Sequence, residues 1–412
     1  MAFLVPVDYE DSNHRHSCAD YRRGFRWRHI PRNRPPPENN GDWCDRFEDL
    51  GDLYKDKKNP YIQEVDLFFR AHYQFGYTDG DNLGQDFSGD GGEFRRFRVG
   101  AAIEFLDGFK LVSRINIQEG GFRDDKIGYD DFDQLYLEYG FGDVGVFENV
   151  TLGYGRYKIA FGGEEHDSSR EIKTVERSNL NNYFAPDRST GVSLEAEYGD
   201  VKMHFGVFTT DEEEALADWK SPSTSRSCSF GCLTTAGVAY YASFEFDLGK
   251  KNDLIVDFIY NDANPAVEAD SIGYEWAASV THLSEIGDID LFLNATYGKT
   301  HGGNDVYGFV VMPSTELIKN KLEAVVRYQY ANADASVFKI NKRNVRNARS
   351  ADSGVAPAIN TGDLNHTIYA GLNYFLCEDH AKFQLGAEYE TLTGRFVDVE
   401  ATTLWAAFKL DF

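Results

Sequence analysis

The final stretch of the chain, ATTLWAAFKLDF (401–412), carries the pattern that decides the fold. Every second side chain from Leu404 to Phe412 is apolar, whereas Lys409 and Asp411 occupy the opposite alternation. A period of two is typical of a β-strand with one apolar and one polar face. We therefore predict that the chain ends in an amphipathic strand whose last residue is aromatic.

The same alternation recurs along most of the chain from residue 62 onward. It predicts about sixteen strands, at 62–77, 93–106, 109–119, 130–141, 146–158, 188–198, 201–209, 236–247, 252–262, 271–281, 288–297, 305–312, 317–331, 365–376, 381–391 and 401–412. Alternation alone suits either a sandwich of two sheets or a closed barrel.

The lengths of the connections decide between these two folds. Short turns such as GDVG (142–145) and GKKN (249–252) alternate with long connections. The long connections are 78–92, 120–129, 159–187, 210–235, 263–270, 298–304, 332–364 and 392–400. This alternation is typical of outer-membrane barrels, with short periplasmic turns and long extracellular loops. We therefore predict an all-β fold over 61–412, a transmembrane antiparallel β-barrel, closed because lipid tolerates no unpaired sheet edge.

The composition agrees with a barrel rather than with a helical membrane protein. The 412 residues include 24 Tyr and 31 Phe, and the mean hydropathy is −0.48. A spanning strand needs only about 9–11 residues with one apolar face, whereas a spanning helix needs roughly 18 apolar residues in a row. The net charge of −25 argues against a nucleic-acid partner, because a polyanion would be repelled. The opening run MAFLVPV is too short for a signal peptide, so we expect a leader that was removed or not included.

Residues 1–60 do not share the alternation. The segment is rich in Arg between 12 and 34 and acidic between 42 and 56. We expect it to be irregular, and two placements stay open: a periplasmic lead-in to the barrel, or a plug inside the lumen. We predict no metal site and no cofactor.

The five cysteines permit two local disulfides. Cys228 and Cys232 lie in one Ser- and Gly-rich loop, and Cys18 and Cys44 both lie in the N-terminal segment. Both pairings suit an oxidising compartment. Cys377, in a predicted short turn, would then remain single.

Residues 153–194 carry a set of motifs found together in one family. They read GYGRYKIAFGGEEHDSSREIKTVERSNLNNYFAPDRSTGVSL. This segment resembles the phosphate-selective porin O/P family, in which a strand ending in G-x-[FY]-K-x-x-F-G precedes a loop with an ERS segment and a strand starting AP-x-R-x-x-GVSL. FRRFRVG (94–100) and QLYLEYG (134–140) are similar to neighbouring strands of that family.

The resemblance implies a sixteen-stranded, usually trimeric porin of the Gram-negative outer membrane, surrounded by lipid and lipopolysaccharide. It also implies passive diffusion of small polar or anionic solutes past a third loop that folds into the lumen. By the count of long connections, 159–187 is that loop. The charged constriction residues expected there are Glu164, Glu165, Asp167, Glu171, Glu176, Arg177 and Arg188.

The polar alternation of the predicted strands also indicates a basic stripe on the lumen wall. Its members are Arg96, Arg98, Lys110, Arg114, Arg156 and Lys158. Arg95 has the opposite alternation and is predicted to face outward. Rows of charge set ion preference in a pore, and Arg suits phosphate oxygens. We therefore expect an anion preference, while simple pairing of Arg and Glu across a wet lumen stays open as the alternative.

Two other classes of function stay open. A barrel plugged by residues 1–60 would be a structural anchor or an assembly scaffold. A barrel enzyme would need a Ser/His/Asp or Asp/His group near the outer rim. His72, His204 and His282 lie in strands or turns without a matching nucleophile pattern, so the enzyme ranks third.

Overall fold

The structure, a computed structural model, describes Cys44 and residues 49–117, 132–186, 188–209, 238–249, 252–262, 274–340 and 361–412. The strands are β1 (Asp52–Lys55), β2 (Ile62–Asn82), β3 (Gln85–Phe105), β4 (Phe109–Asn116), β5 (Phe132–Val144), β6 (Phe147–Lys158), β7 (Arg188–Tyr198), β8 (Val201–Thr209), β9 (Val238–Asp247), β10 (Asn252–Asn261), β11 (Trp276–Ile286), β12 (Ile289–Lys299), β13 (Asp305–Ile318), β14 (Leu322–Ala333), β15 (Leu364–Cys377), β16 (Ala381–Gly394) and β17 (Val397–Asp411). The short helices are η1 (Asp49–Gly51), α2 (Gly163–His166) and α3 (Asn179–Phe184).

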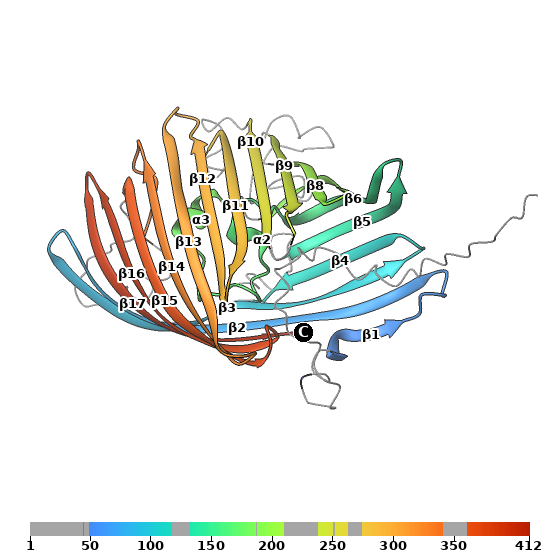
Figure 1. Ribbon diagram of the computed structural model, residues 1–412, viewed down its shortest axis with the longest axis horizontal. Helices are drawn as coiled ribbons and strands as arrows, with labels where there is room; N and C mark the ends of the chain where they lie inside the picture. The colour runs from blue at the N-terminus through green and yellow to red at the C-terminus, as the bar shows by residue number, and fades with distance from the viewer. Residues whose placement is uncertain are drawn as a thin grey trace, which may run out of the picture.

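The strands form one closed antiparallel barrel (Figure 1). Each strand from β2 to β17 pairs with its neighbours in sequence, and β17 also pairs with β2. The sheet has seventeen strands, of which β1 pairs only along the start of β2, so sixteen make up the barrel. The predicted fold and strand number are therefore confirmed. No helix in the described part of the chain is both long and apolar enough to cross a membrane.

The barrel closes at the carboxyl terminus. The Phe412 nitrogen donates to the Phe69 carbonyl and the Phe69 nitrogen to the Phe412 carbonyl, both at 3.0 Å. The two rings stack with their centroids 5.3 Å apart. The terminal aromatic residue thus extends the β17–β2 ladder by one pair, and closure of this ladder leaves no sheet edge in lipid.

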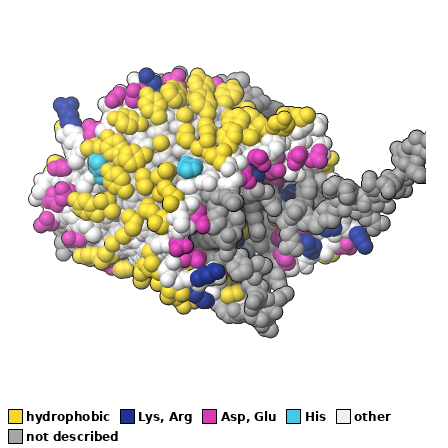
Figure 2. Space-filling view, in the orientation of Figure 1, with side chains coloured by type: hydrophobic (Ala, Val, Ile, Leu, Met, Phe, Trp, Pro, Cys, Tyr) yellow, Lys and Arg dark blue, Asp and Glu magenta, His cyan; other side chains and the backbone are white. Residues whose placement is uncertain are grey.

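The outward face of the barrel is apolar and carries aromatic side chains toward its outer end. In Figure 2 hydrophobic side chains gather over the face formed by β11 to β17. On β2 the exposed apolar residues run from Leu67 to Tyr77, and the outward alternation then continues with Asp79 and Asp81. Exposed tyrosines on this face are Tyr77, Tyr240, Tyr260, Tyr297, Tyr307 and Tyr389. An apolar band with aromatic residues at its border is what a lipid bilayer requires of a barrel.

The predicted first long connection, 78–92, is wrong. β2 and β3 are 21 residues each and continue as one hairpin, whose turn contains Leu83 and Gly84 at φ 56° and 78°. Two positive φ values are typical of the two-residue turn that matches the twist of a hairpin. The prediction failed because the outward residues beyond Tyr77 are acidic, so the hydrophobic alternation ends before the strand does.

The disulfide prediction for Cys44 is also wrong. Cys44 is bonded to Cys377, with 5.4 Å between the Cα atoms and a sequence separation of 333. Spacing in the sequence favoured the nearer Cys18, whereas barrel closure brings β15 close to the chain that leads into β1 and β2. Cys18, Cys228 and Cys232 lie outside the described residues. Of the N-terminal segment, the structure describes Cys44 and residues from 49 onward, and β1 within it is regular rather than irregular.

Candidate functional site

The connection between β6 and β7, here called the third loop (159–187), runs inside the ring of strands (Figure 1). Its backbone carbonyls accept hydrogen bonds of 2.7–2.8 Å from inward-facing side chains of the barrel wall. These bonds join Tyr241 to Ala160, Tyr274 to Phe184, and Asn373 to Lys173. The loop is therefore attached across the wall from β9 to β15.

Apolar side chains of the loop pack against the same wall. Phe161, Leu180 and Phe184 are buried with inward residues of β11 to β14. A Cβ on Gly308 of β13 would lie 2.8 Å from Leu180 Cδ1, so the glycine allows α3 to approach the wall closely. The Ser178 hydroxyl accepts from the Asn181 nitrogen at 3.1 Å and caps α3.

Two lysines on the last strands hold the middle of the loop. Lys409 Nζ donates to the carbonyls of Ser169 (3.4 Å) and Ile172 (3.5 Å). Lys382 Nζ donates to the Ile172 carbonyl at 3.4 Å and to Asp379 Oδ1 at 2.8 Å. Both lysines are buried, so their charges are compensated by the loop and one acid rather than by water.

The adjoining part of the lumen wall carries the arginines of β2 to β4. Arg96 and Arg98 lie on the inward alternation of β3, and both are buried. The Arg114 guanidinium lies 4.1 Å from the centroid of the Phe68 ring, and that of Arg70 lies 5.0 Å from it. Stacking on an aromatic face compensates part of the desolvation of a guanidinium while its N–H edge stays directed sideways.

The loop reaches this wall through one acid and two serines. Glu176 Oε1 accepts from Arg95 Nε on β3 and from Gln74 Nε2 on β2, both at 2.8 Å. Arg70 donates to the hydroxyls of Ser169 (2.6 Å) and Ser168 (3.3 Å). The third loop therefore contacts a continuous arc of the wall, from β9 through β17 to β2 and β3.

The remaining acids of the loop meet bases close to them. Glu165 Oε2 lies 3.1 Å from Lys158 Nζ, and its Oε1 lies 3.2 Å from Arg177 Nε. Burial raises the pKa of the Glu165 carboxyl, but the charges of Arg177, Lys158 and Arg188 outweigh it and hold the pKa well below its usual range. Glu171 pairs with Arg170 at 3.1 Å. Glu165 is therefore an ionised, paired group of the loop.

Comparison with known proteins now identifies the chain. The model of the family described as "Phosphate-selective porin O and P" matches residues 65–248, which include the arginine wall and the third loop. This part of the chain is similar to that porin family. The chain is an outer-membrane protein with the channel-forming fold of porins. No curated protein matches the chain.

Solved porin structures share the fold of this porin at low sequence identity. The anion-selective porin from Comamonas acidovorans has 12% identity and a TM-score of 0.53, and the match covers 85% of this chain and 99% of that chain. The outer membrane channel DcaP of Acinetobacter baumannii has 12% identity and a TM-score of 0.52, covering 87% and 99%. OmpT of Vibrio cholerae has 10% identity and a TM-score of 0.52, covering 85% and 98%. At these identities the likeness shows the fold.

The porin does not bring all six residues of the predicted basic stripe together. Lys110 and Arg114 lie on the inward alternation of β4: Arg114 is opposite Gly100, close to Arg98, whereas Lys110 lies further along, between Glu104 and Glu138. Arg156 instead shares the alternation of the exposed Leu152 and Tyr154, and its Nε donates to the Phe132 carbonyl at 3.1 Å. Its predicted lumen position is wrong, because glycines rather than polar residues mark the inward alternation of β6.

Lys158 lies on the same alternation as Arg156, but its side-chain amino group lies among residues of the third loop. The third loop begins directly after it, and its Nζ donates to the Asp167 carbonyl at 3.1 Å. Arg177 Nη2 donates to the same carbonyl at 2.9 Å, so Asp167 takes part through its backbone. Lys158 therefore belongs with the third loop rather than with the stripe of β3 and β4.

Two β-bulges add charged groups that alternation did not predict. The β2–β3 register shifts between His72 and Tyr73, which places Arg95 in a bulge and turns it to Glu176. The prediction that Arg95 faces outward is therefore wrong. A second shift, next to Arg114, turns Asp133 inward, where it pairs with Arg98 and Arg188, both at 2.8 Å. A bulge adds one residue to a strand and re-aims its side chain.

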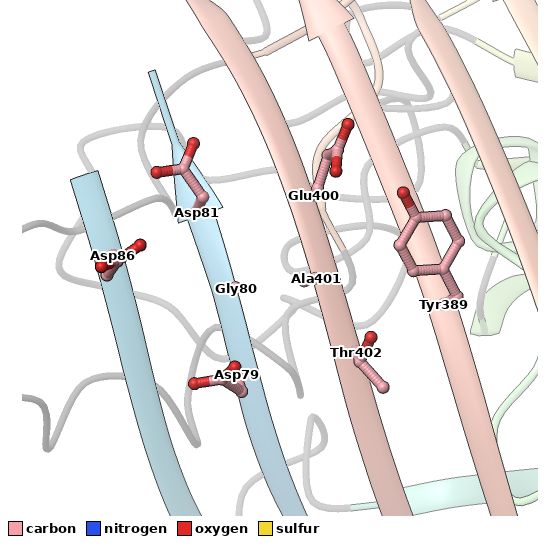
Figure 3. A pocket seen from close by; sticks show the side chains of 8 residues that line it. All are labelled: Asp79, Gly80, Asp81, Asp86, Tyr389, Glu400, Ala401 and Thr402. Carbon is pink, nitrogen blue, oxygen red and sulfur yellow. The ribbon is translucent and has the colours of Figure 1, made fainter. Parts of the chain in front are cut away.

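On the outside of this porin, carboxylates surround a cavity near the outer ends of β2, β3 and β17 (Figure 3). They belong to Asp79, Asp81, Asp86 and Glu400, and Tyr389 lies beside them. Within the described residues, no group of three or more His, Cys, Asp or Glu side chains is arranged to hold a metal ion. This acidic surface faces away from the lumen.

Proposed function

We propose that this porin is a passive diffusion channel for small hydrophilic solutes and that it prefers anions. The solutes would pass between the third loop and the basic stripe. Without Arg156 and Lys158, the stripe consists of Arg96, Arg98, Lys110 and Arg114. The observation that carries the proposal is the concentration of Arg96, Arg98 and Arg114 on two adjacent strands, next to the part of the wall that the loop covers. We propose that the porin catalyses no reaction. We also propose that it forms a trimer, as the family resemblance implies.

The chemistry of the stripe supports an anion preference. Arginine offers a planar set of N–H donors that replaces the hydration of phosphate or carboxylate oxygens. Beside Arg96 the loop supplies one paired acid, Glu176, and beside Arg98 the wall supplies Asp133. Arg96 Nη1 and Arg98 Nε are buried atoms without a hydrogen-bond partner among the described residues. The positive charge of these two guanidinium groups favours a passing anion over a cation.

The test is the reversal potential of the full chain in planar bilayers under a KCl gradient. We expect ohmic steps and a chloride preference for the wild type, and a several-fold fall of the chloride-to-potassium permeability ratio for Arg96→Gln/Arg98→Gln/Arg114→Gln. Each charge contributes about 1 kcal/mol to an ion at about 4 Å in a water-like medium. The single variants Arg114→Gln and Arg156→Gln are the matched pair, because each removes one charge, the first from the stripe and the second from the other alternation; only the first should lower the ratio.

Three outcomes would contradict the proposal. An unchanged ratio in the triple variant would show that the stripe does not act on ions. A ratio that falls as much in Arg156→Gln as in Arg114→Gln would show that only net charge matters. A silent wild type that conducts after deletion of residues 1–43 would support the plugged barrel instead.

A further inference from the structure

Arg327, on β14, joins two wall strands to the third loop. Its guanidinium is fully buried. Nη1 donates to Glu164 Oε1 (3.2 Å), Thr174 Oγ1 (3.0 Å) and the Glu176 carbonyl (2.8 Å). Nη2 donates to Glu388 Oε2 on β16 at 2.9 Å. The Arg327 side chain therefore holds α2 and the 174–176 segment of the loop against β14 and β16.

Glu176 connects Arg327 to the arginine wall. Its carbonyl accepts from Arg327 and also from the Thr174 hydroxyl, at 2.7 Å. Its carboxylate accepts from Arg95 on β3 and Gln74 on β2. Because its backbone is held by β14 and its carboxylate by β2 and β3, Glu176 bridges these two parts of the wall.

The energetics make Arg327 the less replaceable end of this bridge. Charge-assisted hydrogen bonds are about twice as strong as neutral ones, and Arg327 makes several of them in a site that excludes water. Removing the guanidinium alone would leave Glu164 and Glu388 as buried acids without their common partner, which is strongly unfavourable. Arg95, by contrast, is part-buried, so water is able to replace its contact with Glu176.

We infer that Arg327 is a positioning residue for the ion path: it holds Glu176 against Arg95, and so sets both the space beside the stripe and the charge balance there. This inference rests on the proposed diffusion function. Arg327 itself lies under the loop and does not face the path. Its effect on ions is therefore exerted through Glu176.

The direction of the selectivity change separates this role from a direct one. If the Arg327 charge acted on ions itself, its removal would weaken an anion preference. If Arg327 positions Glu176, its removal withdraws a carboxylate from Arg95 and strengthens the preference. The same withdrawal widens the space between the loop and the stripe, so conductance rises.

The experiment compares three variants with the wild type in planar bilayers. Arg327→Gln/Glu388→Gln removes the ion pair without changing the net charge, and we expect a conductance higher by about twofold and a higher chloride-to-potassium ratio. Thr174→Ala changes no charge and is mild for folding, and we expect a smaller shift in the same direction. Glu176→Gln gives the full selectivity change directly, and adding it to the pair variant should raise the ratio no further.

A second readout does not depend on ion flow. Hydrogen exchange of residues 172–180 should become faster in the pair variant and in Thr174→Ala. Unchanged exchange and an unchanged ratio in Thr174→Ala, with the same result in any folded pair variant, would overturn the inference. So would a shift toward potassium in both. A third outcome separates the two proposals. If the wild type does not conduct but hydrogen exchange is faster in the variants, the diffusion proposal fails while the anchoring of the loop by Arg327 holds.

Discussion

The two walls of the lumen use the same residue types for different purposes. On the β9–β17 wall, Arg327, Lys382 and Lys409 are buried under the third loop and donate to its carbonyls or to acids. On the β2–β4 wall, Arg114 stacks on Phe68 and Arg96 lies opposite His72. The difference teaches that a lumen-facing cation has no fixed role. It is an anchor where the loop supplies acceptors, and we propose that its charge acts on passing ions where the loop does not.

The largest expected effect concerns the disulfide that joins the segment before β1 to the β9–β17 wall. Cys44→Ser/Cys377→Ser removes a link between the chain that leads into β2 and the end of β15. A crosslink that closes a loop of several hundred residues stabilises by up to about 5 kcal/mol in the chain-entropy model. We expect the variant to lose its heat-resistant migration in detergent gels at a lower temperature. Reductant should lower that temperature in the wild type and leave the variant unchanged; equal temperatures without reductant would contradict the bond.

The next effect tests whether cations on the β9–β17 wall are anchors. Lys382→Gln/Lys409→Gln removes donors to the Ser169 and Ile172 carbonyls, and we expect a loss of about 2 kcal/mol in the free energy of unfolding. The chloride-to-potassium ratio should stay as in the wild type, because both charges lie under the loop. Denaturant unfolding and the reversal potential are the two measurements. The exposed pair Lys319→Gln/Lys321→Gln is the matched control and should change neither.

A smaller effect, of opposite sign to neutralising the stripe, is expected at Asp133. Asp133→Asn removes the acid that pairs with Arg98 and Arg188. Two guanidinium groups then lose their counter-charge, so the chloride-to-potassium ratio should rise by less than the triple stripe variant lowers it. Asp288→Asn, in an exposed turn, removes an equal charge as the control. A rise of the same size in both variants would mean that the site of the charge is irrelevant.

The smallest effect is the pH dependence of the Glu165 contribution. The folded-state pKa of Glu165 lies below its ordinary value of 4.5, so its stabilisation is complete above that value and is lost only as pH falls through the lowered pKa. The difference in Tm between wild type and Glu165→Gln should therefore stay constant from about pH 7 to about pH 5. A difference that narrows within that range would show that Glu165 is not held by Lys158 and Arg177.

Much of the fold was predictable, because lipid imposes one rule on every strand. The alternation that ends in Phe412 and the series of short and long connections predict the sixteen strands found in β2 to β17. The same rule locates Arg96, Arg98, Lys110 and Arg114, since each is polar on a strand whose other face is apolar. Arg327 was also visible as a polar residue on an alternating strand, but nothing local indicates how many acceptors surround it.

The site was less predictable wherever a side chain depends on a distant partner or on an interruption of the strand. Arg95 and Asp133 face inward because each lies in a bulge, and a bulge shifts the alternation without a clear sequence signal. Arg156 was misplaced because glycine leaves the inward alternation of β6 unmarked. These errors fall on the charged residues that line or approach the third loop.

The sequence by itself determined a closed barrel and the strand on which it closes, because period-two alternation and backbone pairing in lipid are local requirements of each segment. Only the tertiary structure decided that Cys44 meets Cys377 and that Glu176 lies between Arg327 and Arg95. Contacts between residues hundreds of positions apart, or across the lumen, exist only after closure brings the strands around the loop. Phe412 illustrates both cases. Its place in the alternating pattern is a local property of the sequence, whereas its pairing with Phe69 exists only in the closed barrel.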